Sequence, residues 1–364
     1  MRELKPDLVQ PGTPGGATPA GAEARLPLWR SAASQRTRDL AWCTLSPPLL
    51  AALPDEYRSE VARLAQWPAG ERAAWQAWLA HADPDTLPET IAELSGHPDP
   101  TGSRSLRLGR HAERLLHFAL GHAPGMALMA ANVPIRRANG HGIQTLGELD
   151  LIWRDPALGQ VVHWEMAAKF YLMVDAIDGG TDRRAFVGPN LVDRLGDKLD
   201  HIVRRQLPLG RTAEAEALVG CPVNRSEIYL LGWLFYRDGV LPPGLASLGI
   251  APDHLHGWWS TLEAWHARAT APENRGSRWC RLPRVDWLSG ARVDEAGTEQ
   301  AGTLCQALAR RFADPDQVWR REAPVMICEL TPAEGEPGVW LERSRGFIVP
   351  PDWEGRARLR AGRP

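Results

Sequence analysis

The chain has 364 residues, of which 44% are hydrophobic, and a formal net charge of −2. This length allows one large domain or two to three small ones, with enough apolar residues for a sizeable core. The nearly neutral charge excludes a global attraction to nucleic acid or to an acidic membrane, so nucleic-acid contact requires a local patch. The five scattered cysteines have no metal-ligand spacing, and no apolar run is long enough to span a bilayer, so we expect a cytoplasmic protein.

The first quarter of the chain shows two compositions. Residues 1–25 are rich in Pro, Gly and Ala without an apolar period, which predicts a disordered tail. Residues 26–100 carry short amphipathic patterns and end in a stretch with Gly and Pro, which predicts an N-terminal helical region and a linker. The chain has 16 Trp against 4 Tyr and 6 Phe, and we interpret the tryptophans of this region as core packing rather than a base-stacking surface.

The next segment predicts a helix with one acidic residue at the border of its apolar face. From Leu106 to Leu120, apolar residues recur at helical spacing and form one stripe. Glu113 lies at the edge of this stripe. It can extend to solvent, which is the ordinary behaviour of such a residue, or point along the sheet toward a site. A strand is predicted next, from Met126 to Arg136.

Two short strands, separated by a turn, are predicted between residues 147 and 171. Side-chain alternation places Glu148 and Asp150 on one face of the first strand, and Glu165 and Lys169 on one face of the second. If the strands pair, the carboxylates can hold a hard divalent cation, and the lysine can orient a water or steady a phosphate. The alternative is a set of solvated charges with ordinary cross-strand ion pairs. The apolar context favours the metal site, because charges in a buried strand are costly unless paired.

The choice of cations draws attention to the lysines. Of the 42 Lys and Arg residues, only Lys5, Lys169 and Lys198 are lysine. Lys5 falls in the predicted tail. The other two lie close to the acidic strands, where arginine is no adequate replacement for a compact point charge.

A helix is expected to start at Gly188-Pro189-Asn190, with Asn190 as its N-cap, and to end before Pro208. Its basic and titratable residues fall on one flank at spacings of four, three and four, and Gln206 lies near its apolar side. We name these five residues the basic ridge: Arg194, Lys198, His201, Arg205 and Gln206. We expect the ridge to contact phosphates. The alternative is a solvated face with internal ion pairs.

The rest of the chain predicts a buried strand and a C-terminal α+β extension. Residues 227–236 form a nearly continuous apolar run, which is typical of a buried strand. In the extension, residues 241–364, the segments 252–269 and 299–312 predict helices. Residues 324–349 predict a β-hairpin.

The order helix, three strands, helix, strand resembles the core of the PD-(D/E)XK nuclease-like superfamily. The stretch GELDLIW, residues 147–153, is similar to the GEIDL strand of Holliday-junction-resolvase-like members. Within the resemblance, Asp150 matches the metal-binding aspartate and Glu165 matches the acid of the (D/E)XK strand. Glu113 is similar in place to a helical acid that some members use. The chain as a whole looks most like an uncharacterised bacterial family attached to that superfamily, the domain of unknown function 1853.

The resemblance implies an α/β fold with a restriction-endonuclease-like αβββαβ core, a mixed central sheet flanked by helices, over residues 101–240. Helical and α+β additions precede and follow it. One departure concerns the lysine, which stands two residues after the acid in the superfamily. Here that position is Ala167, and Lys169 stands four after Glu165 on the same strand face, about 6.6 Å beyond Ala167. Migration of the lysine and loss of catalysis are both open.

The resemblance therefore implies a metal-dependent nuclease that hydrolyses phosphodiester bonds of nucleic acid with Mg²⁺ or Mn²⁺. It assigns catalysis to Asp150, Glu165 and Lys169, and adds Glu113 and Glu148 to the outer coordination of the metal. The basic ridge would follow the phosphate backbone. Two alternatives stay open: a catalytically degenerate nuclease fold that binds nucleic acid, and an interaction scaffold, for which the Trp-rich flanks are the only support. The sequence distinguishes neither DNA from RNA nor one oligomeric state from another.

Overall fold

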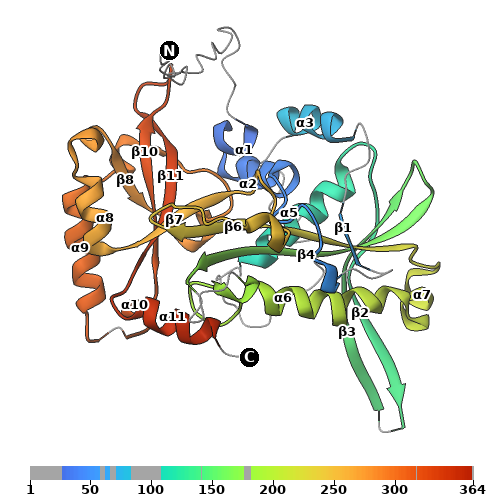
Figure 1. The fold of residues 1–364 in the computed structure, drawn as a ribbon. Helices are drawn as coiled ribbons and strands as arrows, with labels where there is room; N and C mark the ends of the chain where they lie inside the picture. The colour runs from blue at the N-terminus through green and yellow to red at the C-terminus, as the bar shows by residue number, and fades with distance from the viewer. Residues whose placement is uncertain are drawn as a thin grey trace, which may run out of the picture.

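The computed structural model describes residues 27–57, 62–65, 71–82, 108–140, 142–175, 182–316 and 318–362. The predicted tail and the predicted linker lie outside these residues. Within them, the protein has an α/β architecture in which helices flank a large mixed sheet of eleven strands (Figure 1). No helix among these residues combines the length and the apolar character needed to cross a membrane.

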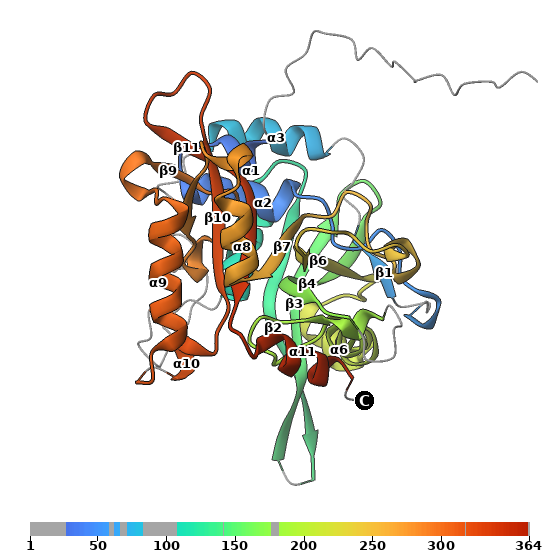
Figure 2. The ribbon, with the colours of Figure 1, turned by 60° about the vertical axis from the view of Figure 1, so that its left-hand side comes forward.

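The centre of the sheet follows the order of elements expected from the sequence. α5 (Leu108–His122) precedes an antiparallel meander of β2 (Ala127–Asn139), β3 (Gly142–Asp155) and β4 (Gln160–Met173). β6 (Arg225–Arg237) then pairs in parallel with β4 along most of its length. The predicted helix, the three predicted strands and the buried strand are therefore confirmed. The far end of the β2–β3 hairpin extends away from the body of the molecule (Figure 2).

Helices cover both faces of this sheet and enclose two separate parts of the core (Figure 1). α5 and the N-terminal helices bury the face that carries Trp153 and Trp164. The opposite face, with Ala167 and Tyr171 of β4, packs against α6. The bounds of these helices are α1 (Leu28–Ser31), α2 (Gln35–Leu45), α3 (Glu71–His81), α6 (Leu195–His201) and α7 (Ala213–Val219). The N-terminal region also contributes a strand, β1 (Ala62–Leu64), which pairs in parallel with β6.

The helix that carries the ridge begins later than the sequence predicted. Asn190 does not cap it, because Leu191 has a φ of 60°, in the left-handed region that a right-handed helix excludes. The chain instead turns until Arg194, which stands at the N-cap, and α6 starts at Leu195. The helix continues from Ile202 to Gln206 as a π-helical turn. This displaced start changes the direction in which the ridge residues point.

The C-terminal extension continues the same sheet. β7 (His256–Thr261) lies in parallel between β6 and β11 (Val339–Val349), and β10 (Val325–Pro332) joins β11 as the predicted hairpin. The helix expected over residues 252–269 is correct only from Leu262, because Trp258 and Trp259 are buried in two different parts of the core, as strand alternation requires. The remaining elements are β5 (Phe186–Val187), β8 (Arg278–Arg281), β9 (Arg292–Asp294), α8 (Leu262–Ala269), α9 (Ala301–Ala313), α10 (Val318–Arg321) and α11 (Trp353–Ala361).

Candidate active site

The candidate site lies where β3 and β4 separate. Their ladder ends at the pair formed by Leu151 and Trp164, and Asp150 and Glu165 are the next residues on the two strands. We call this point the fork. Beyond it β3 stays paired with β2, and β4 stays paired with β6. Among the described strands, the other edge of β4 then has no ladder partner until β5 joins it at Leu172. Backbone and side-chain groups at the fork are therefore available for contacts other than sheet hydrogen bonds.

Hydrogen bonds and an ion pair fix the side chains at the fork. Asp150 occupies the vacated edge of β4, because its Oδ2 accepts a hydrogen bond of 2.9 Å from the backbone N–H of Met166. Glu165 is 1% exposed, and its Oε1 lies 3.7 Å from the Nζ of Lys198 on α6. The same Nζ donates to Oε1 of Gln206 at 3.2 Å. Helix α6 thus supplies the amine that faces the two acids.

One oxygen of the site has an unsatisfied hydrogen-bonding capacity. The Oε2 of Glu165 is buried and accepts no hydrogen bond from the described residues. The Nε2 of His163 lies 3.9 Å from this oxygen, which is too far for a hydrogen bond. Burial lowers the pKa of His163 to about 4, so this ring is neutral near pH 7. A buried carboxylate oxygen without a partner is costly, and it marks a place for a cation or a proton.

The acids at the fork bind protons more tightly than free carboxyl groups do. Burial, and next the charges of Asp150 and Glu148, raise the pKa of Glu113 from 4.5 to about 7. Burial is also the largest cause that raises the pKa of Asp150 and that of Glu165, and these two carboxyl groups are close enough to share a hydrogen bond. Burial lowers the pKa of Lys198 despite its acidic neighbours. The buried acids therefore hold protons that exposed carboxyl groups would release, and a divalent cation that replaced these protons would offset the repulsion among the carboxylates.

The four predicted metal ligands interact electrostatically, but they differ in exposure. Glu113 from α5, Asp150 from β3 and Glu165 from β4 are partly or fully buried, whereas Glu148, whose charge also acts on Glu113 and Asp150, is exposed. In the part of the chain that is described, no three His, Cys, Asp or Glu side chains form a group that could hold a metal ion alone. Magnesium commonly takes only one or two carboxylates and completes its octahedron with water and substrate phosphate. The donor set at the fork fits that pattern rather than a closed protein cage.

A comparison of the sequence with known protein families identifies the family of the chain. Residues 38–349 match the model of a family described as domain of unknown function (DUF1853). The protein belongs to the DUF1853 family. No significant match was found among curated proteins or among solved structures. The predicted resemblance to this family is thus confirmed, and the DUF1853 match includes both the fork and most of the C-terminal extension.

Lys169, the predicted catalytic lysine of this DUF1853 protein, has a different partner from the one expected. Its Nζ lies 2.7 Å from Oδ2 of Asp193, which also accepts a hydrogen bond of 3.3 Å from the hydroxyl of Tyr171. Alternation keeps Lys169 on the same face of β4 as Glu165, as predicted. The ammonium group nevertheless belongs to an ion pair further along the strand, and Lys198 is the lysine beside Glu165.

The basic ridge is divided by the structure. Lys198 and Gln206 face the fork. His201 and Arg205 are exposed on the same flank. Burial lowers the pKa of His201, and the charges of Lys198 and Arg205 lower it further. Arg194 is not part of this surface. It is 3% exposed, and its guanidinium bonds Asp197 and the backbone oxygens of α11 because Arg194 precedes the helix at its N-cap.

Sequence reasoning missed three contributions to the site: the place of Lys198 beside Glu165, the buried His163, and Asp193 as the partner of Lys169. The rarity of lysine indicated both Lys169 and Lys198, but alternation along a strand could only connect Lys169 with Glu165. His163 stands two residues before Glu165, on the same strand face, and this spacing was the available signal for a buried neighbour of the acid. Asp193 gave no signal, because it lies in the turn that replaces the expected first turn of the helix.

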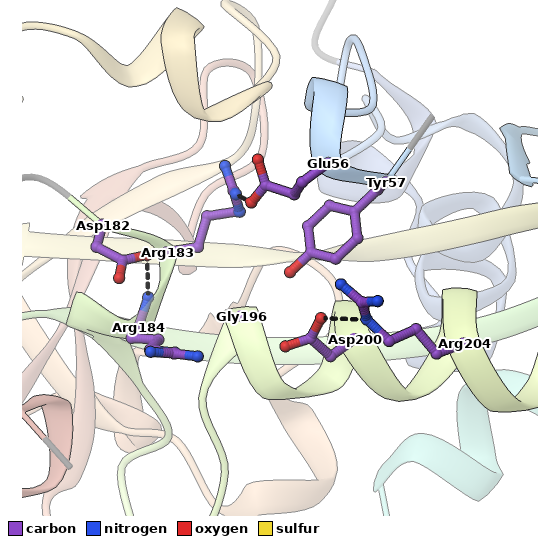
Figure 3. A pocket seen from close by; sticks show the side chains of 8 residues that line it. All are labelled: Glu56, Tyr57, Asp182, Arg183, Arg184, Gly196, Asp200 and Arg204. Carbon is purple, nitrogen blue, oxygen red and sulfur yellow. Dashed lines mark hydrogen bonds and ion pairs between the residues drawn. The ribbon is translucent and has the colours of Figure 1, made fainter. Parts of the chain in front are cut away.

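A second charged cavity lies on another flank of α6 and has a different character (Figure 3). It has a volume of about 320 Å³, and the ring of Tyr57 lies between the pair of Glu56 and Arg183 and the pair of Asp200 and Arg204. Its three arginines are matched by three acids: Glu56, Asp182, Arg183, Arg184, Asp200 and Arg204. Arg183 pairs with Glu56, and Arg204 with Asp200. The charges of this cavity are balanced within it, and the pair of Glu56 and Arg183 joins the N-terminal region to the turn before β5.

Proposed function

We propose that this protein is a metal-dependent nuclease that hydrolyses phosphodiester bonds of nucleic acid. The observation that supports the proposal is the convergence of Asp150 and Glu165 at the fork, with the amine of Lys198 beside them. We interpret α5, the β2–β4 meander, α6 and β6 as the restriction-endonuclease-like αβββαβ core of the PD-(D/E)XK superfamily. In that interpretation the acids come from the two strands that separate, as the resemblance of the sequence implies.

The residues present fit a magnesium or manganese ion. Asp150 and Glu165 would hold it, and the buried Oε2 of Glu165 has the free lone pairs that a ligand needs. Glu113 and the exposed Glu148 would bind its waters in the outer coordination. When bound, such an ion polarises the scissile phosphate and lowers the pKa of a coordinated water.

The chain's own residues then have separate tasks. Lys198 steadies Glu165 and supplies a compact positive charge for the attacking water or for the charge that develops on the phosphate. Gln206 holds the Lys198 amine in place through its hydrogen bond. The exposed His201 and Arg205 continue this flank and are positioned to contact the phosphate backbone of the nucleic acid.

A cleavage assay tests the proposal directly. Purified protein is incubated with supercoiled plasmid, linear duplex DNA, single-stranded DNA and RNA, with Mg²⁺, with Mn²⁺ and with EDTA. We expect metal-dependent cleavage of at least one substrate, abolished in Asp150→Asn and retained in Asp253→Asn, whose exposed carboxylate lies on a turn far from the fork in the sequence. Cleavage by Asp150→Asn at the wild-type rate would contradict the role of the fork.

A catalytically degenerate nucleic-acid-binding protein is the second candidate. The observation that favours it is the absence, among the described residues, of a ready group of three metal-binding side chains. It predicts nucleic-acid binding without cleavage under every metal condition. The scaffold alternative depends on the Trp-rich flanks, and its support is weaker because twelve of the 16 tryptophans are buried: Trp29, Trp42, Trp75, Trp153, Trp164, Trp233, Trp258, Trp259, Trp265, Trp279, Trp287 and Trp353.

A further inference from the structure

A larger cavity lies beyond the fork, between the core and the C-terminal extension. It has a volume of about 630 Å³, which is within the range of cavities that bind small organic ligands. The core lines it with residues of β4, of α5 and of the turn before α6, and the extension lines it from the opposite side. The side chains that matter for its chemistry are Lys169, Phe170, Asp193, Arg284, Trp287 and Arg311.

Two elements lead directly from the acids to this cavity. Along β4, Lys169 stands four residues after Glu165, a distance of about 13 Å. Along α5, Gly109 lines the cavity and Glu113 stands one turn later on the same helix face, about 6 Å away. The fork and the cavity are consecutive parts of one surface.

The lining combines positive charge with two aromatic side chains that are largely buried, Phe170 at 7% and Trp287 at 9% exposed. Three cationic side chains and one acid line this cavity, in contrast to the balanced charges of the cavity in Figure 3. The rings of Phe170 and Trp287 lie 5.6 Å apart, and the guanidinium of Arg284 lies 5.7 Å from the ring centre of Trp287. Cations beside aromatic faces are the usual means of holding a phosphate and a base of a single-stranded nucleic acid.

We propose that this cavity binds one unpaired nucleotide of the substrate strand, with its phosphate toward Lys169 and its base against the wall formed by Phe170 and Trp287. This inference rests on the proposed function, because it places the nucleotide on the strand whose phosphate reaches the fork. About 13 Å corresponds to about four nucleotides of a stacked strand, and to fewer in an extended one. A base in a duplex is stacked and paired, so the cavity selects a single strand or an unpaired end.

The C-terminal extension gains a function from this arrangement. Arg284, Trp287 and Arg311 belong to it, so the cavity is incomplete without the extension. The DUF1853 match includes these residues together with the fork. A family whose shared segment includes both parts is consistent with a site that needs both.

Filling the cavity from Gly109 gives the first test. A Cβ added at Gly109 has no described atom within 4 Å, and the same holds at Gly302. Each is the second residue of its helix, so Gly302→Phe is a matched control for Gly109→Phe. The probe is fluorescein-labelled single-stranded dT12, and its binding is measured by anisotropy in EDTA, so that no cleavage is required. We expect Gly109→Phe to weaken binding about tenfold, the usual contribution of one stacked base, and Gly302→Phe to bind as the wild type does.

A charge at the rim gives the second test without filling any space. Val192 lines the cavity and is 70% exposed, and Val240 is 72% exposed on a turn outside its lining. Because both side chains are largely in solvent, Val192→Asp and Val240→Asp should fold equally well and carry the same net charge. We expect only Val192→Asp to weaken dT12 binding, with the larger loss at low salt, since the new carboxylate repels the bound phosphate.

The outcomes separate this proposal from the nuclease itself. If the wild type cleaves no substrate but both cavity variants bind dT12 more weakly than it does, the nuclease proposal is wrong and the nucleotide-binding role of the cavity is supported. If Val192→Asp cleaves and binds dT12 as the wild type does, the nucleotide-binding role of the cavity is wrong and the nuclease proposal is unaffected. This outcome can be read even if Gly109→Phe misfolds. Binding of thymidine 5′-monophosphate but not of dT12 would show a free-nucleotide site and also overturn the proposal.

Discussion

The Nζ of Lys198 on α6 lies 3.7 Å from Oε1 of Glu165 on β4, and this contact brings a helical amine to the point where β3 and β4 separate. Glu165 is buried, and its other oxygen accepts no hydrogen bond from the described residues, so the amine compensates only part of the carboxylate. The oxygen that lacks a partner lies at the position where a metal ion would bind. Removal of Lys198 therefore affects both the charge balance of the site and the proposed chemistry.

The first prediction compares the two lysines near the fork. Lys198→Ala should lower the cleavage rate on the order of a hundredfold, as loss of a charge-stabilising donor does, with little change in metal affinity. Lys198→Arg should not restore the rate, because a planar guanidinium cannot act as a compact point charge. Lys169→Ala should reduce substrate binding more than the rate at saturating substrate, because its amine pairs with Asp193 and lines the cavity. Single-turnover kinetics of both variants separate these effects.

The opposite pattern would restore the role that the sequence suggested for Lys169. If Lys169→Ala loses the chemical step while Lys198→Ala retains it, the ion pair with Asp193 must open in the substrate complex. Ala167→Lys in the Lys169→Ala background would then return activity, because it places an amine at the superfamily position on the same strand face.

The second prediction concerns the stability of the metal-free protein as pH changes. Asp150, Glu165 and Glu113 all have folded-state pKa values above those of free carboxyl groups. Their contribution to stability is therefore complete below about pH 4 and is lost as the pH rises through the folded pKa, which for Glu113 is about 7. For Glu113 alone, a rise from 4.5 to about 7 corresponds to about 3 kcal/mol.

Urea denaturation in EDTA between pH 5 and pH 8 measures this effect. The free energy of unfolding should decrease over this range in the wild type and decrease less in Asp150→Asn, since removal of one charge relieves the repulsion among the acids. The control Asp253→Asn should follow the wild type. Parallel curves for wild type and Asp150→Asn would mean that the acids do not interact as the geometry indicates.

The convergence of the two strand acids was accessible from the sequence because strand alternation is a local rule, although the separation of the strands was not. Alternation placed Asp150 and Glu165 on defined faces of two strands, and the turn between them indicated that the strands pair. Helical spacing likewise placed Glu113 at the edge of the apolar stripe of α5. Each of these inferences depends only on residues a few positions apart, and each agrees with the structure.

The lysine of the fork was not accessible in the same way. Its identity depends on how α6 crosses β4, which is a tertiary relationship, and on the left-handed Leu191 that delays the start of the helix. The same delay takes Arg194 out of the ridge and leaves Asp193 free to bind Lys169. In the extension, tryptophans are buried on both faces of β7. The resulting short run of apolar residues has no strand-like alternation, so the sequence pattern could not distinguish this strand from a helix.

The third prediction tests the exposed part of the ridge with two adjacent arginines. Arg205 lies on the flank with His201, whereas Arg204 pairs with Asp200 on the side of the balanced cavity. Arg205→Gln should flatten the dependence of nucleic-acid affinity on salt by roughly 0.7 to 0.9 in the log–log slope, as loss of one phosphate contact does. Arg204→Gln should leave the slope unchanged. Equal slopes for both variants and the wild type would identify the flank as a solvated face.

The last prediction couples metal binding to stability. A ligand that binds only the folded protein raises its stability by about 2.7 kcal/mol at a concentration one hundred times its Kd, so Mn²⁺ should raise the Tm of the wild type. The rise should be larger at pH 8 than at pH 6, because the raised pKa values of Glu113, Asp150 and Glu165 mean that the ion must displace protons at the lower pH. Asp150→Asn should show little rise at either pH, while Asp253→Asn responds as the wild type does. Differential scanning calorimetry with Mn²⁺ and with EDTA measures the shift, and an equal rise in Asp150→Asn would place the metal outside the fork.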